Sequence, residues 1–417
     1  MQLKFLGGAQ EVGRSAILLK DEHTLMLDYG IKLNHKIEYP IAMPNIDAFI
    51  LSHAHLDHSG FAPALYNEML VPAFGTEPTL KLSELLLNDS LGIAKKEHMN
   101  PKFHKRQISS FMQRYTSIDY HSGASIGSFD IKLFDAGHIC GSAITLIERR
   151  NAKENKRIVY TGDYKLLPQY LHKGAEVVKS DVLITESTYA TRDHPEKEGL
   201  VRQFVEKVKE TLDNKGTVLL PVFAVGRSQE ILMLLHKNNL TQYTYLDGMA
   251  RSATSIALKY KNFLSGSDIL EKAFEETTVI KGRDERTGAL NTPSIILTTA
   301  GMLTGGPVLD YITKLRNNSS ILLTGYQVEG SNGRMLMDKG TVIIDNNLIK
   351  VNAPVSYYDM SAHAGKKELY EYVKESGPSK VICVHGDSEN ASNMAENLKL
   401  EGYDAYAPKD GDVIKID

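Results

Sequence analysis

The densest group of chemically capable side chains is the segment SHAHLDHSG at residues 52–60. It directly follows the apolar segment DAFIL, so we expect it on the loop that leaves the carboxyl end of a strand, where ligand sites of α/β sheets gather. Three imidazoles and one carboxylate within six residues are costly to bury and repel one another when protonated, and a bound metal ion removes both costs. His53 and His55 can face one ion, whereas Asp57 and His58 can face a second ion about 3.5 Å away.

Because one loop cannot complete the coordination of two ions, further ligands must follow later in the chain. Three candidates occur in the same setting at the end of an apolar run: His138 after IKLFDAG, Asp163 after RIVYTG and His385 after VICV. His138 can complete a three-histidine site, Asp163 can bridge both ions, and His385 can complete the second site. Upstream, Asp28 ends the strand-like segment TLML, and we expect it to orient a ligand imidazole without touching a metal.

The donor types also indicate which metal binds and what it does. Imidazoles and carboxylates without thiolates suit zinc best, with manganese as the alternative, so we expect two zinc ions per chain. Two such ions lower the pKa of a bridging water molecule near neutral pH and polarise a substrate oxygen. The expected chemistry is therefore hydrolysis with hydroxide as the nucleophile, and we find no Ser/His/Asp set that competes with this interpretation.

The elements that must position these residues are short strands alternating with helices. The apolar runs are short, often β-branched, and end in polar or glycine-rich loops, whereas residues 79–96, 199–214 and 227–237 carry apolar residues at helical spacing. This alternation predicts an α/β protein, and the hairpin-like turns of the first 150 residues predict that the first sheet is mixed.

Composition excludes several classes of protein. The 417 residues are 42% hydrophobic and 24% charged, with a net charge of −3, which excludes a basic, histone-like coat for nucleic acid. Two cysteines, Cys140 and Cys383, make neither a disulfide framework nor a cysteine zinc ribbon, and we expect both to be buried packing residues. We see no secretory signal and no apolar run approaching the ~20 residues of a membrane span, so we expect a cytoplasmic enzyme with no membrane partner.

The metal set resembles that of the metallo-β-lactamase superfamily, and the rest of the chain resembles its β-CASP ribonucleases. The closest likeness is to archaeal and bacterial homologues of the cleavage and polyadenylation specificity factor endonuclease, which are related to ribonuclease J. The matching segments are LGGAQEVGRSA (6–16), SHAHLDHSG (52–60), AGHICGSA (136–143), YTGDY (160–164), TESTYATRDH (185–194), PVFAVGRSQE (221–230), GMLTGGPVLDY (301–311), GYQVEGSNGRML (325–336), MSAHAG (360–365) and VHGD (384–387).

This resemblance implies a fold and a domain order. The fold would be an αββα metallo-β-lactamase sandwich with an inserted α/β β-CASP domain. Residues 1–194 would form the first part of the catalytic domain, 195–355 the inserted domain, and 356–417 the C-terminal part of the catalytic domain. The last ligand would then arrive from the C-terminal segment.

The resemblance also implies the catalytic residues beside the metals. Glu186 matches the acid of the first β-CASP motif, and His363 matches the histidine of the second. His363 would be the general acid or phosphate donor, with Glu186 holding its imidazole in the protonated form, and we count Asp57 with them as catalytic. The family often has Asp after S-A-H-A, but this chain has Gly365, so support for that motif must come from elsewhere.

The expected substrate is single-stranded RNA, cleaved in RNA processing or decay. Candidate substrate contacts are the glycine-rich loop with Gly305 and Gly306, together with Arg227 and Ser361. The alternatives are a metallohydrolase of a small ester or lactam and a non-catalytic scaffold of an RNA-processing complex. The sequence leaves open whether the activity is endonuclease or 5′→3′ exonuclease and which bases are preferred. It also leaves open whether the chain forms a homodimer or joins a larger complex.

Overall fold

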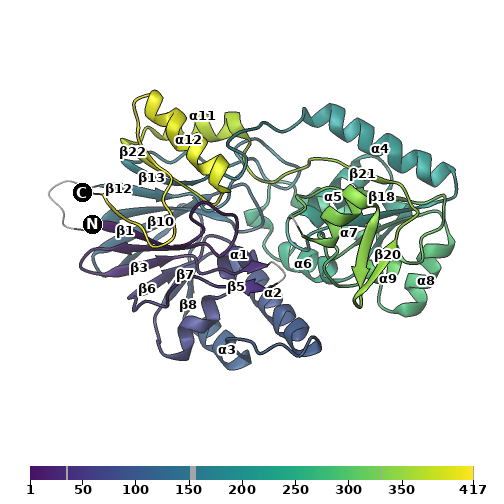
Figure 1. Ribbon diagram of the computed structural model, residues 1–417, viewed down its shortest axis with the longest axis horizontal. Helices are drawn as coiled ribbons and strands as arrows, with labels where there is room; N and C mark the ends of the chain where they lie inside the picture. Colours follow the sequence, from purple (N-terminus) through teal and green to yellow (C-terminus); the bar gives the residue numbers. More distant parts are fainter. Residues whose placement is uncertain (34–35, 151–155, 329, 417) are drawn as a thin grey trace. The chain divides into compact units, whose positions relative to one another are not determined.

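The computed structural model describes residues 1–33, 36–150, 156–328 and 330–416, and it forms two compact units (Figure 1). The first unit contains Met1–Pro168, Lys173–Asp193 and His363–Asp417. The second unit contains Gln169–His172 and His194–Ala362. The chain therefore leaves the first unit and returns to it, so that residues from both ends of the sequence share one fold.

Two seven-stranded sheets form the centre of the first unit. The strands of one sheet are β1 (Gln2–Gly7), β2 (Ala16–Lys20), β3 (Thr24–Leu27), β6 (Ala48–Ile50), β7 (Ala73–Gly75), β8 (Tyr115–Ser117) and β24 (Val413–Lys415). The strands of the other are β9 (Gly123–Ile126), β10 (Phe129–Asp135), β11 (Ala143–Arg149), β12 (Arg157–Tyr160), β13 (Val182–Glu186), β22 (Lys380–Val384) and β23 (Asp404–Tyr406). Their orders are β24-β1-β2-β3-β6-β7-β8 and β23-β22-β13-β12-β11-β10-β9. The first sheet is mixed, as predicted, because β1, β2 and β3 pair antiparallel whereas β3, β6, β7 and β8 pair parallel.

The inner faces of these two sheets pack against each other. In β10, Phe129, Ile131 and Leu133 are buried and alternate with less buried residues, because successive side chains of a strand point to opposite faces. They join Leu3 and Phe5 of β1 in one core cluster that draws on both sheets. Burial of these apolar side chains is the main force that holds the sheets together.

Helices cover the outer faces, which gives the expected αββα arrangement. The helices of the first unit are α1 (Leu56–Ser59), α2 (Glu77–Lys96), α3 (Lys105–Gln113), α11 (Lys366–Ser376) and α12 (Ser388–Leu400). Leu80 of α2 and Phe111 of α3 share a core cluster with the first sheet, whereas Tyr372 of α11 and Met394 of α12 share one with the second. Figure 1 shows the two helix pairs on opposite sides of this unit.

The second unit is built on a six-stranded parallel sheet with the order β16-β15-β17-β14-β18-β21. Its strands are β14 (Thr217–Pro221), β15 (Thr244–Leu246), β16 (Thr278–Val279), β17 (Ser294–Thr298), β18 (Ser320–Leu323) and β21 (Val355–Tyr357), with a hairpin of β19 (Thr341–Ile344) and β20 (Asn347–Lys350). Its helices are α4 (Lys197–Asp213), α5 (Arg227–Lys237), α6 (Met249–Ala257), α7 (Ser267–Glu275), α8 (Arg283–Asn291), α9 (Val308–Ile312) and α10 (Asn332–Lys339). The central strands β14, β17 and β18 are buried along their whole length, as is typical of parallel sheets.

The expected boundaries lie at residues 194/195 and 355/356, and the compact units depart from them in three places. The smallest difference is that His194 already belongs to the second unit. Gln169–His172 belongs to the second unit, where the N–H groups of Tyr170 and Leu171 donate to the buried carboxylate of Glu230 at 3.1 and 2.6 Å. Residues 356–362 also belong to the second unit, because β21 is an edge strand of its sheet. The partly polar segment VSY of β21 is too short for its sequence pattern to mark it as a strand.

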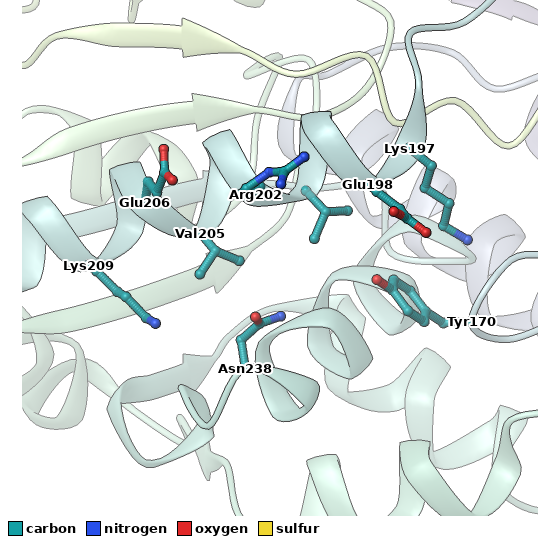
Figure 2. A pocket seen from close by; sticks show the side chains of 9 residues that line it. Tyr170, Lys197, Glu198, Arg202, Val205, Glu206, Lys209 and Asn238 are labelled. Carbon is teal, nitrogen blue, oxygen red and sulfur yellow. The ribbon is translucent and has the colours of Figure 1, made fainter.

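A pocket of about 700 Å³ lies in the second unit along α4 (Figure 2). At one end, the ammonium groups of Lys197 and Lys237 each lie 4.6 Å from the centroid of the Tyr170 ring. No residue to which the sequence analysis assigned chemistry lines this pocket. Among the described residues, no helix combines the length and apolar character that crossing a bilayer requires.

Candidate metal centre

The seven predicted metal ligands all lie in the first unit, in segments that follow strand ends. Four of them follow β6, two on the loop and two in the short helix α1, and the loops after β10, β12 and β22 carry one each. In order, these residues are His53, His55, Asp57, His58, His138, Asp163 and His385. The two sheets thus deliver ligands from positions 53 to 385 of the sequence to one place.

One group of side chains consists of His53, His55, His138 and Asp163, whose potential ligand atoms lie within 4.8 Å of one another. Asp163 Oδ2 lies 3.6 Å from His53 Nε2 and 3.9 Å from His138 Nε2. His138 Nε2 lies 3.2 Å from His55 Nδ1. Three imidazoles and one carboxylate at this spacing form a suitable donor set for zinc.

A second group consists of Asp57, His58, Asp163 and His385, again with ligand atoms within 4.8 Å of one another. His58 Nε2 lies 3.3 Å from Asp163 Oδ2, and His385 Nε2 lies 3.5 Å from Asp163 Oδ1. Asp57 Oδ2 lies 3.6 Å from His385 Nε2. Asp163 therefore belongs to both groups, and the structure brings it to the position from which one carboxylate can serve two ions.

Hydrogen bonds orient both rings of the second group. The fully buried carboxylate of Asp28 accepts bonds from His58 Nδ1 and from the Tyr160 hydroxyl, both at 2.6 Å, and from the N–H and hydroxyl of Ser52 at 2.7 and 2.6 Å. Ser15 Oγ lies 2.8 Å from Nδ1 of His385. These contacts to Nδ1 leave Nε2 of each ring directed toward Asp163, which is the usual way in which proteins set a ligand imidazole.

The buried polar atoms of these groups fit a cation. Among the described residues, His53 Nε2, His58 Nε2, His385 Nε2 and Asp163 Oδ1 are buried and have no hydrogen-bond partner. Burying such atoms unpaired is costly, and coordination of a metal ion would satisfy them.

The electrostatics of the groups point the same way. Burial and the neighbouring His58 hold the pKa of His53 well below its ordinary value, so this ring keeps a free lone pair. Although burial opposes ionisation, His385 and His58 hold the pKa of Asp163 well below its usual range. Burial also opposes charge on His58, yet Asp163 and Asp28 raise its pKa well above the ordinary value. Asp163 is therefore held ionised and His53 neutral, which are the forms in which each can bind a metal ion.

Glu186 and His363 lie beside the metal groups, as the family resemblance implied. Glu186 is the last residue of β13 and is buried, and its carboxylate lies 3.0 Å from His363 Nδ1. His363 Nδ1 also lies 3.8 Å from Asp163 Oδ2, and the His363 side chain stays 23% exposed. Burial opposes charge on His363, but Glu186 and Asp163 raise its pKa to about 9. The ring is thus held in its protonated form and stays partly exposed.

The backbone around His363 is supported by residues that the sequence analysis did not single out. Lys165 Nζ donates to the carbonyl of His363 at 3.1 Å and to the carboxylate of Glu368. Glu368 in turn accepts from the N–H of Gly365 at 3.2 Å, at the start of α11. The family often has an aspartate where this chain has Gly365. The Lys165–Glu368 pair supports this segment instead. The sequence did offer one signal for Lys165, because this residue directly follows the YTGDY motif.

The remaining candidate residues have other settings. Arg227, Gly305, Gly306 and Ser361 belong to the second unit, outside the unit that carries the metal groups. The prediction for the cysteines is confirmed, because Cys140 and Cys383 are buried free thiols.

Three family models match the chain. The Beta-Casp domain matches residues 228–336, and the Zn-dependent metallo-hydrolase RNA specificity domain matches residues 348–408. A model of the anti-Pycsar protein Apyc1 matches residues 1–211, the part that holds six of the seven predicted ligands. The zinc-dependent description and the His/Asp groups together support metal binding.

Curated relatives and solved structures agree with these matches. The chain is 41% identical to the probable RNase MJ4 of Methanocaldococcus jannaschii, with all of both chains covered. It is 35% identical to RNase aCSPSF2 of Saccharolobus solfataricus, covering 99% of this chain and 85% of that protein. It is 34% identical to the transcription termination factor FttA of M. jannaschii, covering all of this chain and 72% of that protein.

A crystal structure of a protein of unknown function from Enterococcus faecalis shares the fold, with a TM-score of 0.64, 15% identity and 99% of both chains covered. Full-length relatives above 30% identity, together with the Beta-Casp and metallo-hydrolase models, identify the family. The chain belongs to the β-CASP ribonucleases of the metallo-β-lactamase superfamily, and it has the predicted metallo-β-lactamase fold with an inserted β-CASP domain.

Proposed function

We propose that this protein is a zinc-dependent ribonuclease that hydrolyses phosphodiester bonds of single-stranded RNA in RNA processing or decay. The observation that carries the proposal is that two four-residue donor groups share the buried carboxylate of Asp163. The names of the relatives, which include RNases, and the RNA specificity model over residues 348–408 support RNA as the substrate class.

The first unit would hold two zinc ions, one in each donor group. His53, His55 and His138 would bind one ion, Asp57, His58 and His385 the other, and Asp163 both. Bound zinc would lower the pKa of a water molecule to near neutrality and offset negative charge on the phosphoryl oxygens. Manganese is the alternative metal for the same donors.

The chain's own residues would manage the proton of the leaving group. Cleavage of a phosphodiester bond releases a 3′ oxygen, which leaves readily only when it receives a proton. Glu186 contacts Nδ1 of His363, so the proton would come from Nε2 of the same ring. Asp57, whose side chain is 31% exposed, lies at the open side of its donor group and would face the substrate as well as the metal.

Two other functions were considered from the sequence. A non-catalytic scaffold needs neither donor group, so retention of both groups and of the His363–Glu186 pair favours an enzyme. A hydrolase of a small ester or lactam needs no RNA specificity domain, which favours RNA over a small substrate. Three further points stay predictions: the homodimer or larger complex, the cytoplasmic location, and the RNA contacts of Arg227, Gly305, Gly306 and Ser361.

The proposal is tested with zinc-loaded protein, single-stranded RNA, a duplex of the same sequence and a chromogenic lactam. We expect cleavage of the single strand only, and loss of that cleavage in His55→Ala. His121→Ala is the matched control, because the His121 side chain of the same unit is 58% exposed and belongs to neither donor group. Hydrolysis of the lactam with intact RNA would contradict the proposed substrate.

A further inference from the structure

The parallel sheet of the second unit has a position where ligands of α/β proteins commonly bind. From β14 the chain continues to β15, which lies toward one edge of the sheet. From β18 it continues to β21, which lies at the other edge. Where neighbouring parallel strands connect in opposite directions, their carboxyl ends open a crevice that loops can line. Here β14 ends at Pro221 and β18 ends at Leu323, so the segments 222–226 and 324–328 line this edge.

Two aromatic side chains lie on these segments. Phe223 follows β14 and is partly buried, and Tyr326 follows β18 and is 50% exposed. The Phe223 ring sits against Gly325, where an added Cβ would lie only 2.8 Å from the ring atom Cε2. An added Cβ at Gly301 would lie 2.9 Å from the backbone nitrogen of Phe223 and 3.3 Å from its Cδ2 atom. A larger residue at Gly325 would displace the ring, and a larger residue at Gly301 would collide with the backbone of Phe223.

A buried side chain fixes the loops that hold this ring. Gln327 is 5% exposed, and its Nε2 donates to the carbonyl of Gly301 at 3.2 Å and to the carbonyl of Gly325 at 2.9 Å. The loop after β17 and the loop after β18 are therefore tied together around Phe223. The ring is held in place before any ligand arrives, which lowers the entropic cost of stacking something on it.

The adjoining glycine-rich loop offers hydrogen-bond donors. In the part of the chain that the structure describes, the N–H groups of Gly305 and Gly306 donate no hydrogen bond. No atom lies within 4 Å of the position where a Cβ of Gly305 would be, so a ligand can approach the backbone there. Backbone N–H groups in such loops are suited to phosphate oxygens.

We propose that Phe223 and Tyr326 form a stacking position for one base of single-stranded RNA, with the adjacent phosphate bound by the N–H groups of Gly305 and Gly306. This inference rests on the proposed ribonuclease function and names where the second unit holds its substrate. Stacking on an aromatic ring tolerates every base, because each base has a π-face, so this position binds RNA without selecting sequence.

The test combines substitutions with a series of RNAs that each lack the base at one position. The variants are Phe223→Leu, which keeps an apolar side chain in the partly buried position, and Tyr326→Ala, which changes an exposed residue. The matched control is Tyr243→Ala, because Tyr243 is a 41% exposed tyrosine that precedes β15 and so lies at the opposite end of the strands. The readouts are kcat and KM for cleavage by the zinc-loaded protein.

Loss of one stacked base should weaken binding by about 5- to 150-fold, seen in KM more than in kcat. At one position of the RNA, removing the base should raise KM of the wild type by such a factor. Removing the same base should leave KM of Phe223→Leu and of Tyr326→Ala unchanged. Wild-type KM in both variants, or equal losses at every position of the RNA, would overturn the stacking position while leaving the ribonuclease intact. A wild type that neither binds nor cleaves any RNA of the series would overturn the proposed function itself.

Discussion

Removing the hydroxyl of Ser15 should weaken zinc binding in one donor group and leave the other unchanged. Ser15 Oγ lies 2.8 Å from Nδ1 of His385, and it is the group that holds this ring with Nε2 toward Asp163. The substitution Ser15→Ala removes one buried hydrogen bond and almost no volume, so its cost in unfolding free energy should be about 1 kcal/mol. Its effect on the metal should be larger, because the partners that orient ligand imidazoles typically contribute about 10- to 100-fold in metal affinity.

The measurement is a competition titration of the zinc-loaded protein with a chromophoric chelator, which resolves two successive losses of metal. In Ser15→Ala, the ion held by Asp57, His58 and His385 should leave at about 10- to 100-fold lower chelator concentration. The control is Ser83→Ala: Ser83 is equally buried in the first unit, and its hydroxyl has no hydrogen-bond partner among the described residues. Wild-type release of both ions from Ser15→Ala would refute the claim that Ser15 sets the ligand geometry.

Three further predictions concern the proton donor, the fold and the mode of cleavage. His363→Ala should reduce kcat by roughly 10²- to 10⁴-fold with both metals retained, and Glu186→Gln should reduce it less; loss of zinc from His363→Ala would instead make His363 a metal ligand. Thr76→Ala should lower the unfolding free energy in urea by about 1 kcal/mol, because Thr76 Oγ1 accepts from the N–H of Thr79 at the start of α2. Circular single-stranded RNA should be cleaved, which would establish endonuclease activity. If the circle resists while a 5′-monophosphorylated linear RNA releases mononucleotides, the enzyme is a 5′→3′ exonuclease instead.

Most of the candidate metal centre could be predicted because its residues carry strong local signals. The spacing H-x-H-x-D-H and the position of each ligand after an apolar strand are both visible in the sequence, and parallel strand ends meet at one edge of a sheet. The same holds for α5, whose predicted bounds, 227–237, are those observed. Local periodicity decides such elements, since it reports which face of a helix or strand is buried.

What the sequence analysis missed depends on contacts between distant parts of the chain. Ser15 and His385 are 370 residues apart, and Lys165 and Glu368 are 203 apart, so no local pattern connects them. Ser15 stands in the glycine-rich segment LGGAQEVGRSA, where it resembles an ordinary loop residue until β22 brings His385 beside it. Likewise, Phe223 and Tyr326 acquire a shared role only when β14 and β18 become neighbours in the sheet.

The central claim is that one carboxylate, that of Asp163, serves two zinc ions. The direct measurement is the zinc content of the purified protein by mass spectrometry, for the wild type, Asp163→Ala and the control Asp130→Ala, whose parent side chain is 50% exposed. The account predicts about two zinc ions per chain in the wild type and the control, and the loss of zinc and of RNA cleavage in a folded Asp163→Ala. An Asp163→Ala protein that keeps two zinc ions and cleaves RNA at the wild-type rate would contradict it.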